Sequence, residues 1–385
     1  MFSFLKSKFD KRKPSTLLKQ LYTDLNPTAN PKPLSKNNSA SLSESSVEVA
    51  DESISKRYTE LEEFLSAAAS GTTFHSKPVN PEETERCIAI AIEQDILFTI
   101  ALRINDIGKE LRRVVSNVWN LLLKLQHPKT KQFTMVDYLT SHTGCIGTLF
   151  AAYGATSDST INIGVMLRDS LKSPAIEQYV FQHGLIYQLF TVIESSNFDI
   201  SADAFQTLRE ALTNQKDLGS NWLRDNYDCF FSRYSKLLDA SSEDSYVTVR
   251  QGLNLLSSII LDRGFMKLML RCVEDETLLK NVLMLLSHKS RVIELEAFHV
   301  LKVFVANPNK KPKIAKILSK NSARIIKLLD RIEEGRPDDK EFLLDKRAVV
   351  AKLEVVPDSA SEGDGPLSRP DSAVPSLIPP SSSIK

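Results

Sequence analysis

The side chains that most often catalyse reactions or bind metals are present in this chain, but they do not have the spacing that catalysis or metal binding requires. The six histidines have no metal-ligand spacing to one another or to a cysteine: His75, His127, His142, His183, His288 and His299. The sequence also lacks the phosphate loop GxxxxGK[ST], the dinucleotide motif GxGxxG, the HExxH and GxSxG motifs and an EF-hand loop. We therefore expect no catalytic residues, no cofactor-binding residues and no metal site. On its apolar helix, His299 is expected to be a hydrogen-bonded core residue.

A basic run is the clearest charged feature. Between Asn307 and Arg336 nine lysines and arginines stand against Asp330, Glu333 and Glu334, a local charge of +6. Three readings stay open: a solvated outer face, a site for an acidic peptide, or a nucleic-acid site. Nucleic acid is the least favoured, because the whole chain has a formal charge of only +1 and no aromatic residues interleave the run.

A second feature lies in the segment YVTVRQGLNLLSSIILDR. Tyr246, Arg250 and Asn254 recur every four residues, beside an expected inward stripe of Val249, Leu253, Leu256 and Ile260. Tyrosine and arginine dominate interface hot spots, so this row is either ordinary surface or a binding anchor.

Composition indicates a soluble helical protein with a long core. Hydrophobic residues make up 42% of the 385 residues, and no apolar run is long enough to span a membrane. Cys87, Cys145, Cys229 and Cys272 fall within apolar helical patterns, as expected for reduced core thiols of a cytoplasmic protein. We expect no stable membrane insertion, although the basic, Phe-containing N-terminus could touch an anionic membrane weakly.

Four regions can be distinguished along the chain. Residues 1–25 hold a basic N-terminus and one short helix, and residues 26–51 are Ser-, Asn- and Pro-rich, as in a disordered linker. Helical patterns fill residues 52–356, and residues 357–385 form a Pro/Ser-rich tail that we expect to be disordered.

The helical region repeats itself. AFQTLREAL, GLNLLSSII and AFHVLKVFV each begin with a small residue and place leucine fifth, and weaker copies precede them. The equivalent positions are Val118, Leu167, Leu208, Leu256 and Leu301, which are 49, 41, 48 and 45 residues apart. This period is typical of armadillo or HEAT repeats, so the predicted fold is an all-α, armadillo/HEAT-like solenoid.

The stretch EAFHVLKVFVANPNK shows what such a repeat requires. Only His299 and Lys302 interrupt its apolar run, which suits a helix packed between neighbouring repeats. We expect Asn307, Pro308 and Asn309 to stop the helix, because asparagine tolerates the left-handed turn at a helix end and proline cannot continue the helix.

Several of these motifs, in the same order, closely resemble the calcium-binding protein 39 family, also called the mouse protein 25 family. They include EAFHVLKVFVANPNK, GVMLRDSL, FDISADAFQTLREALT, YDCFFSRYSKLL, YVTVRQGLNLL and HKSRVIELEAFHV. The resemblance extends from the first helix to about Val356 and is strongest from Ile163 to Asn321.

The resemblance implies a non-catalytic scaffold with an armadillo-like fold. Members of that family bind sterile-20-type kinases and pseudokinases, hold them in the active conformation, and with a pseudokinase join the liver-kinase assembly in animals. In fungi they act in polarity and morphogenesis signalling. An adaptor for unrelated trafficking or cytoskeletal cargo is the alternative.

Two sets of site residues follow from the resemblance. The implied kinase-contact surface comprises Phe198, Tyr246, Arg250 and Asn254, the last standing where the family commonly has lysine. The implied pocket for a partner's C-terminal Trp-Glu-Phe peptide comprises Arg263, Phe265, Lys280, Leu283 and Lys320. Leu283 replaces a family methionine, and the chain is one residue shorter between Arg263 and Phe265.

Overall fold

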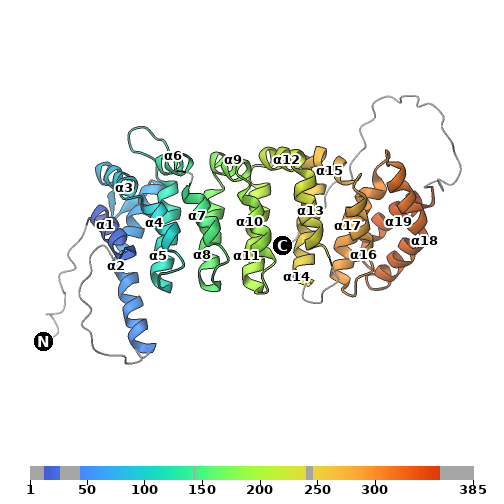
Figure 1. Cartoon of the computed structure of the whole chain (residues 1–385), viewed down its shortest axis with the longest axis horizontal. Coiled ribbons are helices and arrows are strands. Elements are labelled where there is room, and N and C mark those ends of the chain that lie inside the picture. Colours follow the sequence, from blue (N-terminus) through green and yellow to red (C-terminus); the bar gives the residue numbers. More distant parts are fainter. Residues whose placement is uncertain (1–12, 27–43, 143, 240–245, 356–385) are drawn as a thin grey trace. The chain divides into compact units, whose positions relative to one another are not determined.

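The computed structural model describes residues 13–26, 44–142, 144–239 and 246–355, which fold almost entirely into α-helices (Figure 1). The predicted all-α fold class is confirmed. The described strands form one small hairpin, β1 (Thr73–Phe74) and β2 (Lys77–Pro78), which the sequence did not reveal. Its turn residues His75 and Ser76 both have positive φ angles, 48° and 62°. The chain divides into two compact units, residues 1–215 and 216–385.

Unit 1 begins with two helices and the hairpin, which precede three successive groups of three helices. Its helices are α1 (Pro14–Leu25), α2 (Glu44–Ser70), α3 (Pro81–Glu93), α4 (Ile96–Arg103), α5 (Lys109–Lys124), α6 (Thr134–Ser141), α7 (Gly144–Ala152), α8 (Ser157–Ser170), α9 (Pro174–Gln182), the 3₁₀ turn η2 (Leu185–Tyr187), α10 (Gln188–Ile193) and α11 (Phe198–Thr213).

Unit 2 continues the same pattern with two groups of three helices and a final pair. Its helices are α12 (Lys216–Asp225), α13 (Tyr227–Leu237), α14 (Tyr246–Leu261), the 3₁₀ turn η4 (Arg263–Phe265), α15 (Met266–Cys272), α16 (Glu276–Leu285), α17 (Arg291–Ala306), α18 (Pro312–Glu334) and α19 (Lys340–Glu354).

The third helix of each group carries the repeat that the sequence predicted. In unit 1, α2, α5, α8 and α11 pack in succession, and in unit 2, α14 packs on α17 and α17 on α19. The five predicted repeat positions all lie near the middle of a third helix, and all are at most 2% exposed: Val118, Leu167, Leu208, Leu256 and Leu301. The predicted period is therefore confirmed.

The packing of helix α17 explains why its sequence is so apolar. Eight of its residues are buried, spread around most of the helix: Ile293, Glu294, Ala297, Phe298, Val300, Leu301, Phe304 and Val305. It packs against α14, α16, α18 and α19, so nearly every side meets a neighbour. The helix ends at Ala306 as expected, but Asn307 is not left-handed. Its φ and ψ are −56° and 118°, because the residue before a proline favours extended backbone.

Two other expectations need correction. Helix α2 begins at Glu44, eight residues before the expected start, because residues 44–51 contain no proline or glycine to stop it. Cys229 is exposed, whereas Cys87, Cys145 and Cys272 are buried, and all four are free. Within α13 the buried face is formed by other residues: Tyr227, Phe230, Phe231, Tyr234 and Leu237.

The remaining part of the expected linker and the Pro/Ser-rich tail lie outside the described residues, and so does the basic N-terminus up to Arg12. In the described part of the chain, no helix is both long and apolar enough to cross a membrane.

Candidate functional site

Helix α14 presents the predicted tyrosine–arginine row to solvent. Tyr246 opens the helix and is 37% exposed, and Arg250 and Asn254 follow at successive turns and are also exposed. The predicted inward stripe of Val249, Leu253, Leu256 and Ile260 is buried, and Leu255 and Ile259 widen it. The row therefore lies on the solvent-exposed side of α14.

Two contacts fix α14 against the preceding helix. The hydroxyl of Tyr234 donates a 2.7 Å hydrogen bond to the backbone oxygen of Gly252. A Cβ atom at Gly252 would lie 3.0 Å from a methyl group of Leu238, so the glycine allows close packing. A rigid backbone presents the exposed row in one orientation, which lowers the entropy that a partner must remove on binding.

Phe198, the remaining residue of the implied kinase-contact surface, belongs to unit 1. It is the first residue of α11 and is 60% exposed, which is unusual for a large aromatic residue. The side-chain oxygen of Asn197 accepts hydrogen bonds from the backbone N–H groups of Asp199 and Ile200, so the helix start that displays the ring is well capped.

A buried ion pair holds α11 against α8. Arg168 donates to Asp203 at 3.0 Å and to the hydroxyl of Thr207 at 2.8 Å. Tyr153 donates to the same carboxylate, and its burial raises the pKa of this phenol. Gly164 makes room for the network, because a Cβ atom there would lie 1.9 Å from Asp203 Oδ2. The motifs GVMLRDSL and FDISADAFQTLREALT thus contact each other here, and they join consecutive repeats.

In unit 2, helices α16 and α18 run parallel in a fixed register. Three pairs 37 residues apart connect the α16 region to α18: Lys311 with Glu274 at 2.8 Å, Lys313 with Glu276 at 3.0 Å, and Arg324 with Ser287 at 3.2 Å. The same separation relates Lys320 to Leu283, so these two residues lie opposite each other.

The register brings together three of the predicted pocket residues. Lys280 and Lys320 are exposed, and Leu283 is half-buried. Met284, which the sequence reasoning missed, is 69% exposed and lies one turn after Lys280 on the same face of α16. We call these four residues the α16–α18 surface. It combines two cations with apolar surface.

The other two predicted pocket residues lie on a different element. Arg263 and Phe265 form the turn η4, which packs on α12, α14 and α15. Arg263 is exposed, but Phe265 is 0% exposed, so its ring belongs to the core and offers no surface to a ligand in this conformation. Asp262 caps this turn, and its hydrogen bond with Lys216 lowers the pKa of its carboxyl group.

Most of the basic run is paired within the chain. Six of its nine cations have a hydrogen-bond or ion-pair partner: Lys310, Lys311, Lys313, Arg324, Arg331 and Arg336. Lys316, Lys320 and Lys327 have none among the described residues, and helical geometry places all three on one side of α18. The +6 charge counted from the sequence therefore reduces to a stripe of three unpaired lysines.

Nothing in the described residues resembles a catalytic or metal centre. They contain no group of three histidine, cysteine or acidic side chains placed to hold a metal ion. Burial raises the pKa of Cys87 and Cys272 to about 12, so both remain thiols near neutral pH. His299 is half-buried, its pKa is lowered by burial, and it makes no hydrogen bond within the described chain, contrary to expectation.

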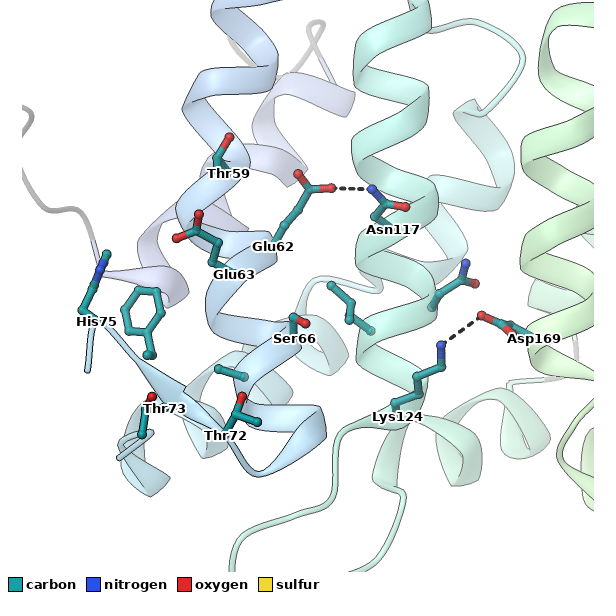
Figure 2. A pocket seen from close by; sticks show the side chains of 14 residues that line it. Thr59, Glu62, Glu63, Ser66, Thr72, Thr73, His75, Asn117, Lys124 and Asp169 are labelled. Atoms are coloured by element: carbon teal, nitrogen blue, oxygen red, sulfur yellow. Dashed lines mark hydrogen bonds and ion pairs between the residues drawn. The ribbon is translucent and has the colours of Figure 1, made fainter. Parts of the chain in front are cut away.

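A cleft in unit 1 was not predicted. It is an open surface cleft of about 710 Å³ between α2, the hairpin, α5 and the end of α8 (Figure 2). Its lining residues come from separate parts of the sequence, so no local pattern marks them. The two asparagines Asn117 and Asn120 within the apolar α5 are the nearest thing to a signal.

The repeated groups of three helices place the chain in the armadillo class of helical-repeat proteins. A family model described as Mo25-like matches residues 3–357, and the chain belongs to this family. Calcium-binding protein 39-like of Mus musculus is 32% identical over 307 residues, which cover 79% of this chain and 87% of that protein. The Mo25-like protein of Schizosaccharomyces pombe is 32% identical over 260 residues, 68% of this chain and 77% of that protein.

Among solved structures, this chain is similar to a designed armadillo repeat protein, YIII(Dq)4CqI. The match covers 67% of this chain and 99% of that protein. Its TM-score is 0.41 and its sequence identity 12%.

Proposed function

We propose that this chain is a non-catalytic cytoplasmic scaffold that binds a sterile-20-type protein kinase or pseudokinase and activates it, in signalling for polarity or morphogenesis. Membership of the Mo25-like family supports the scaffold role. The observation that carries the proposal is the exposed row of Tyr246, Arg250 and Asn254 on the firmly packed helix α14.

The row has the chemistry of a protein-binding anchor. A tyrosine at a helix start supplies a rigid amphipathic ring, and Arg250 one turn later supplies several hydrogen-bond donors. Asn254 adds a neutral polar group where the resemblance leads us to expect a lysine, so the partner of this chain needs no carboxylate at that point. Phe198 on unit 1 adds a second exposed aromatic anchor.

Activation would follow from selective binding. A kinase exchanges between open and closed conformations, and a scaffold that binds the closed state more tightly increases its population. Each tenfold preference corresponds to about 1.4 kcal/mol, which one or two anchor residues can supply. This mechanism requires no catalytic group on the scaffold.

The α16–α18 surface would hold a second part of the partner. An acidic, aromatic C-terminus such as Trp-Glu-Phe could pair its carboxylates with Lys280 and Lys320 and pack its rings on Leu283 and Met284. The burial of Phe265 leaves Arg263 as the part of η4 that could reach such a peptide without rearrangement.

Affinity purification with three forms of the protein tests the proposal. The wild type should retain a sterile-20-type kinase or pseudokinase from its own organism, and Arg250→Ala should lose most of it. Arg347→Ala is the matched control, since this arginine is exposed on α19. Mass spectrometry identifies the bound proteins. Recovery of trafficking or cytoskeletal cargo with no kinase would instead support the adaptor alternative and overturn our proposal.

A further inference from the structure

Helix α19 carries four apolar residues in line on the side that faces solvent. They are Leu344, Ala348, Ala351 and Val355, and all four are exposed, Leu344 by 66% and Val355 by 78%. Successive members are four, three and four residues apart, which keeps them on one side of the helix over a length of about 16 Å. We call these four residues the α19 stripe.

The stripe lies on the side of α19 that points away from unit 2. The opposite side packs on α17 and α18 (Figure 1). There Phe342, Val349 and Leu353 are buried, about 160° round the helix from Leu344. The stripe residues stay exposed, so no element among the described residues covers them. Terminal repeats of helical-repeat proteins ordinarily present a polar outer face, and an apolar stripe on the last described helix therefore indicates a surface that something covers.

The sequence that follows α19 contains an apolar cluster of matching size. In the segment SAVPSLIPP, residues 373–378 hold Ala373, Val374, Leu377 and Ile378 within an otherwise polar tail, outside the described residues. Prolines within and after the cluster favour an extended backbone, in which six residues span about 20 Å. That length is close to the length of the α19 stripe.

The connecting segment is long enough to bring the cluster back to the stripe. Residues 356–372 separate Val355 from Ala373, and a flexible chain of that length has an end-to-end distance of about 20–25 Å. This distance is similar to the length of the stripe, which is the condition under which a tether helps most. The tether gives the cluster an effective concentration on the order of millimolar at the stripe, so even a weak contact is populated.

Charge and size favour this tail over a second copy of the chain as the occupant. The exposed charged side chains of α19 are three cations and two acids, a net charge of +1: Lys340, Glu341, Arg347, Lys352 and Glu354. Residues 357–372 carry one cation and four acids, a net charge of −3: Asp358, Glu362, Asp364, Arg369 and Asp371. Two copies of the stripe would instead bring like charges together. Four side chains a side also fall far short of the about 20–30 residues a side of a stable interface.

We propose that residues 373–378 of this chain dock on the α19 stripe and cover it. The branched side chains of the cluster pack beside Leu344 and Val355, and the two alanines between them leave room for the docked backbone. Docking removes exposed apolar surface from water at the end of unit 2. The stripe shares no residue with the α14 row or the α16–α18 surface, so this inference is independent of the proposed function.

Disulfide trapping in the full chain tests the docking. Ala348→Cys in the stripe is combined with either Ser376→Cys in the apolar cluster or Ser368→Cys in the connecting segment, and Cys229→Ser removes the exposed native thiol. A freely moving tail would close the bond slightly faster with Ser368→Cys, because that position is nearer in sequence. We predict the reverse order, with the Ser376→Cys protein forming its intrachain disulfide about three times faster or more.

Substitutions in the stripe separate docking from chance encounters. Leu344→Asp should abolish the preference for Ser376→Cys, because it places a charge where the cluster packs. Leu270→Asp is the matched control, since Leu270 is an exposed leucine of α15 outside the stripe, and it should keep the preference. Loss of the preference in both variants would mean that the stripe does not hold the tail. A rate for Ser376→Cys no faster than for Ser368→Cys, or disulfide-linked dimers in place of the intrachain bond, would also overturn the proposal.

Discussion

Single residues in this chain act mainly by letting repeats approach or by holding them together. Gly164 has no side chain, and the space this leaves in unit 1 is filled by the carboxylate of Asp203 and the guanidinium of Arg168. The pair is about 90% buried on both sides. A buried ion pair depends strongly on its geometry, because breaking it leaves charges without compensation.

Gly164→Ala should therefore destabilise the protein strongly. The new methyl group would lie 1.9 Å from Asp203 Oδ2 and 2.8 Å from Arg168 Nη1, so the pair must separate. We expect a loss of about 3–5 kcal/mol, as for other broken buried pairs, measured by urea denaturation. Gly147→Ala in α7 is the control, since nothing lies within 4 Å of its added Cβ. Equal effects of both substitutions would contradict the packing argument.

Glu177 is the other residue whose burial has a measurable consequence. It lies in α9, is 0% exposed, and its carboxylate oxygens have no hydrogen-bond partner among the described residues. Burial raises its pKa from 4.5 to about 8, and the nearby backbone amide of Gln215 offsets this only in part. Between these two values the folded state holds a proton that the unfolded state releases. The stability contributed by Glu177 is thus full below about pH 4.5 and is lost as the pH rises through 8.

Glu177→Gln should remove this pH dependence, because the amide is neutral at every pH. The variant should melt at a higher temperature than wild type at pH 8.5, and the difference should nearly vanish at pH 4.5. Thermal melts at the two pH values measure it, with exposed Glu194→Gln as the control. A difference that is the same at both pH values would mean that Glu177 does not titrate as described.

Among the elements, α16 and α18 form the part of the predicted peptide pocket that the structure assembles. Their register places Lys320 opposite Leu283. Neither Lys280 nor Lys320 has a hydrogen-bond or ion-pair partner in the part of the chain that the structure describes. The sequence resemblance identified Lys280, Leu283 and Lys320, but it could not show that Phe265 is buried. That outcome depends on how the turn η4 packs on α12, a helix that ends at Asp225 and is distant from the turn in sequence.

Lys320→Ala should weaken the binding of a peptide ending in Trp-Glu-Phe about fivefold, equivalent to about 1 kcal/mol for one exposed ion pair. Lys327→Ala is the control, because it removes an equally unpaired lysine two turns further along α18. Arg263→Ala then shows whether η4 contributes. Peptide titration followed by anisotropy measures all three. If Lys320→Ala and Lys327→Ala lose affinity equally, the α16–α18 surface is not the binding site.

At the scale of the whole molecule, the repeat period was the most informative feature of the sequence. The anchors Val118, Leu167, Leu208, Leu256 and Leu301 could be predicted because each third helix must bury the same position against its neighbours. The cleft could not be predicted, since it combines residues near 60, 75, 120 and 169. Its chemistry arises only when α2, α5 and α8 pack together.

An activity assay tests most directly whether this chain activates a kinase through the row on α14. A sterile-20-type kinase from the same organism is assayed for phosphate transfer to a protein substrate, with increasing concentrations of scaffold. We predict that the wild type and Arg347→Ala raise kinase activity in a saturable manner, that Arg250→Ala does not, and that the scaffold alone transfers no phosphate. Activity that stays flat with micromolar wild type, or that rises equally with Arg250→Ala, would contradict the account.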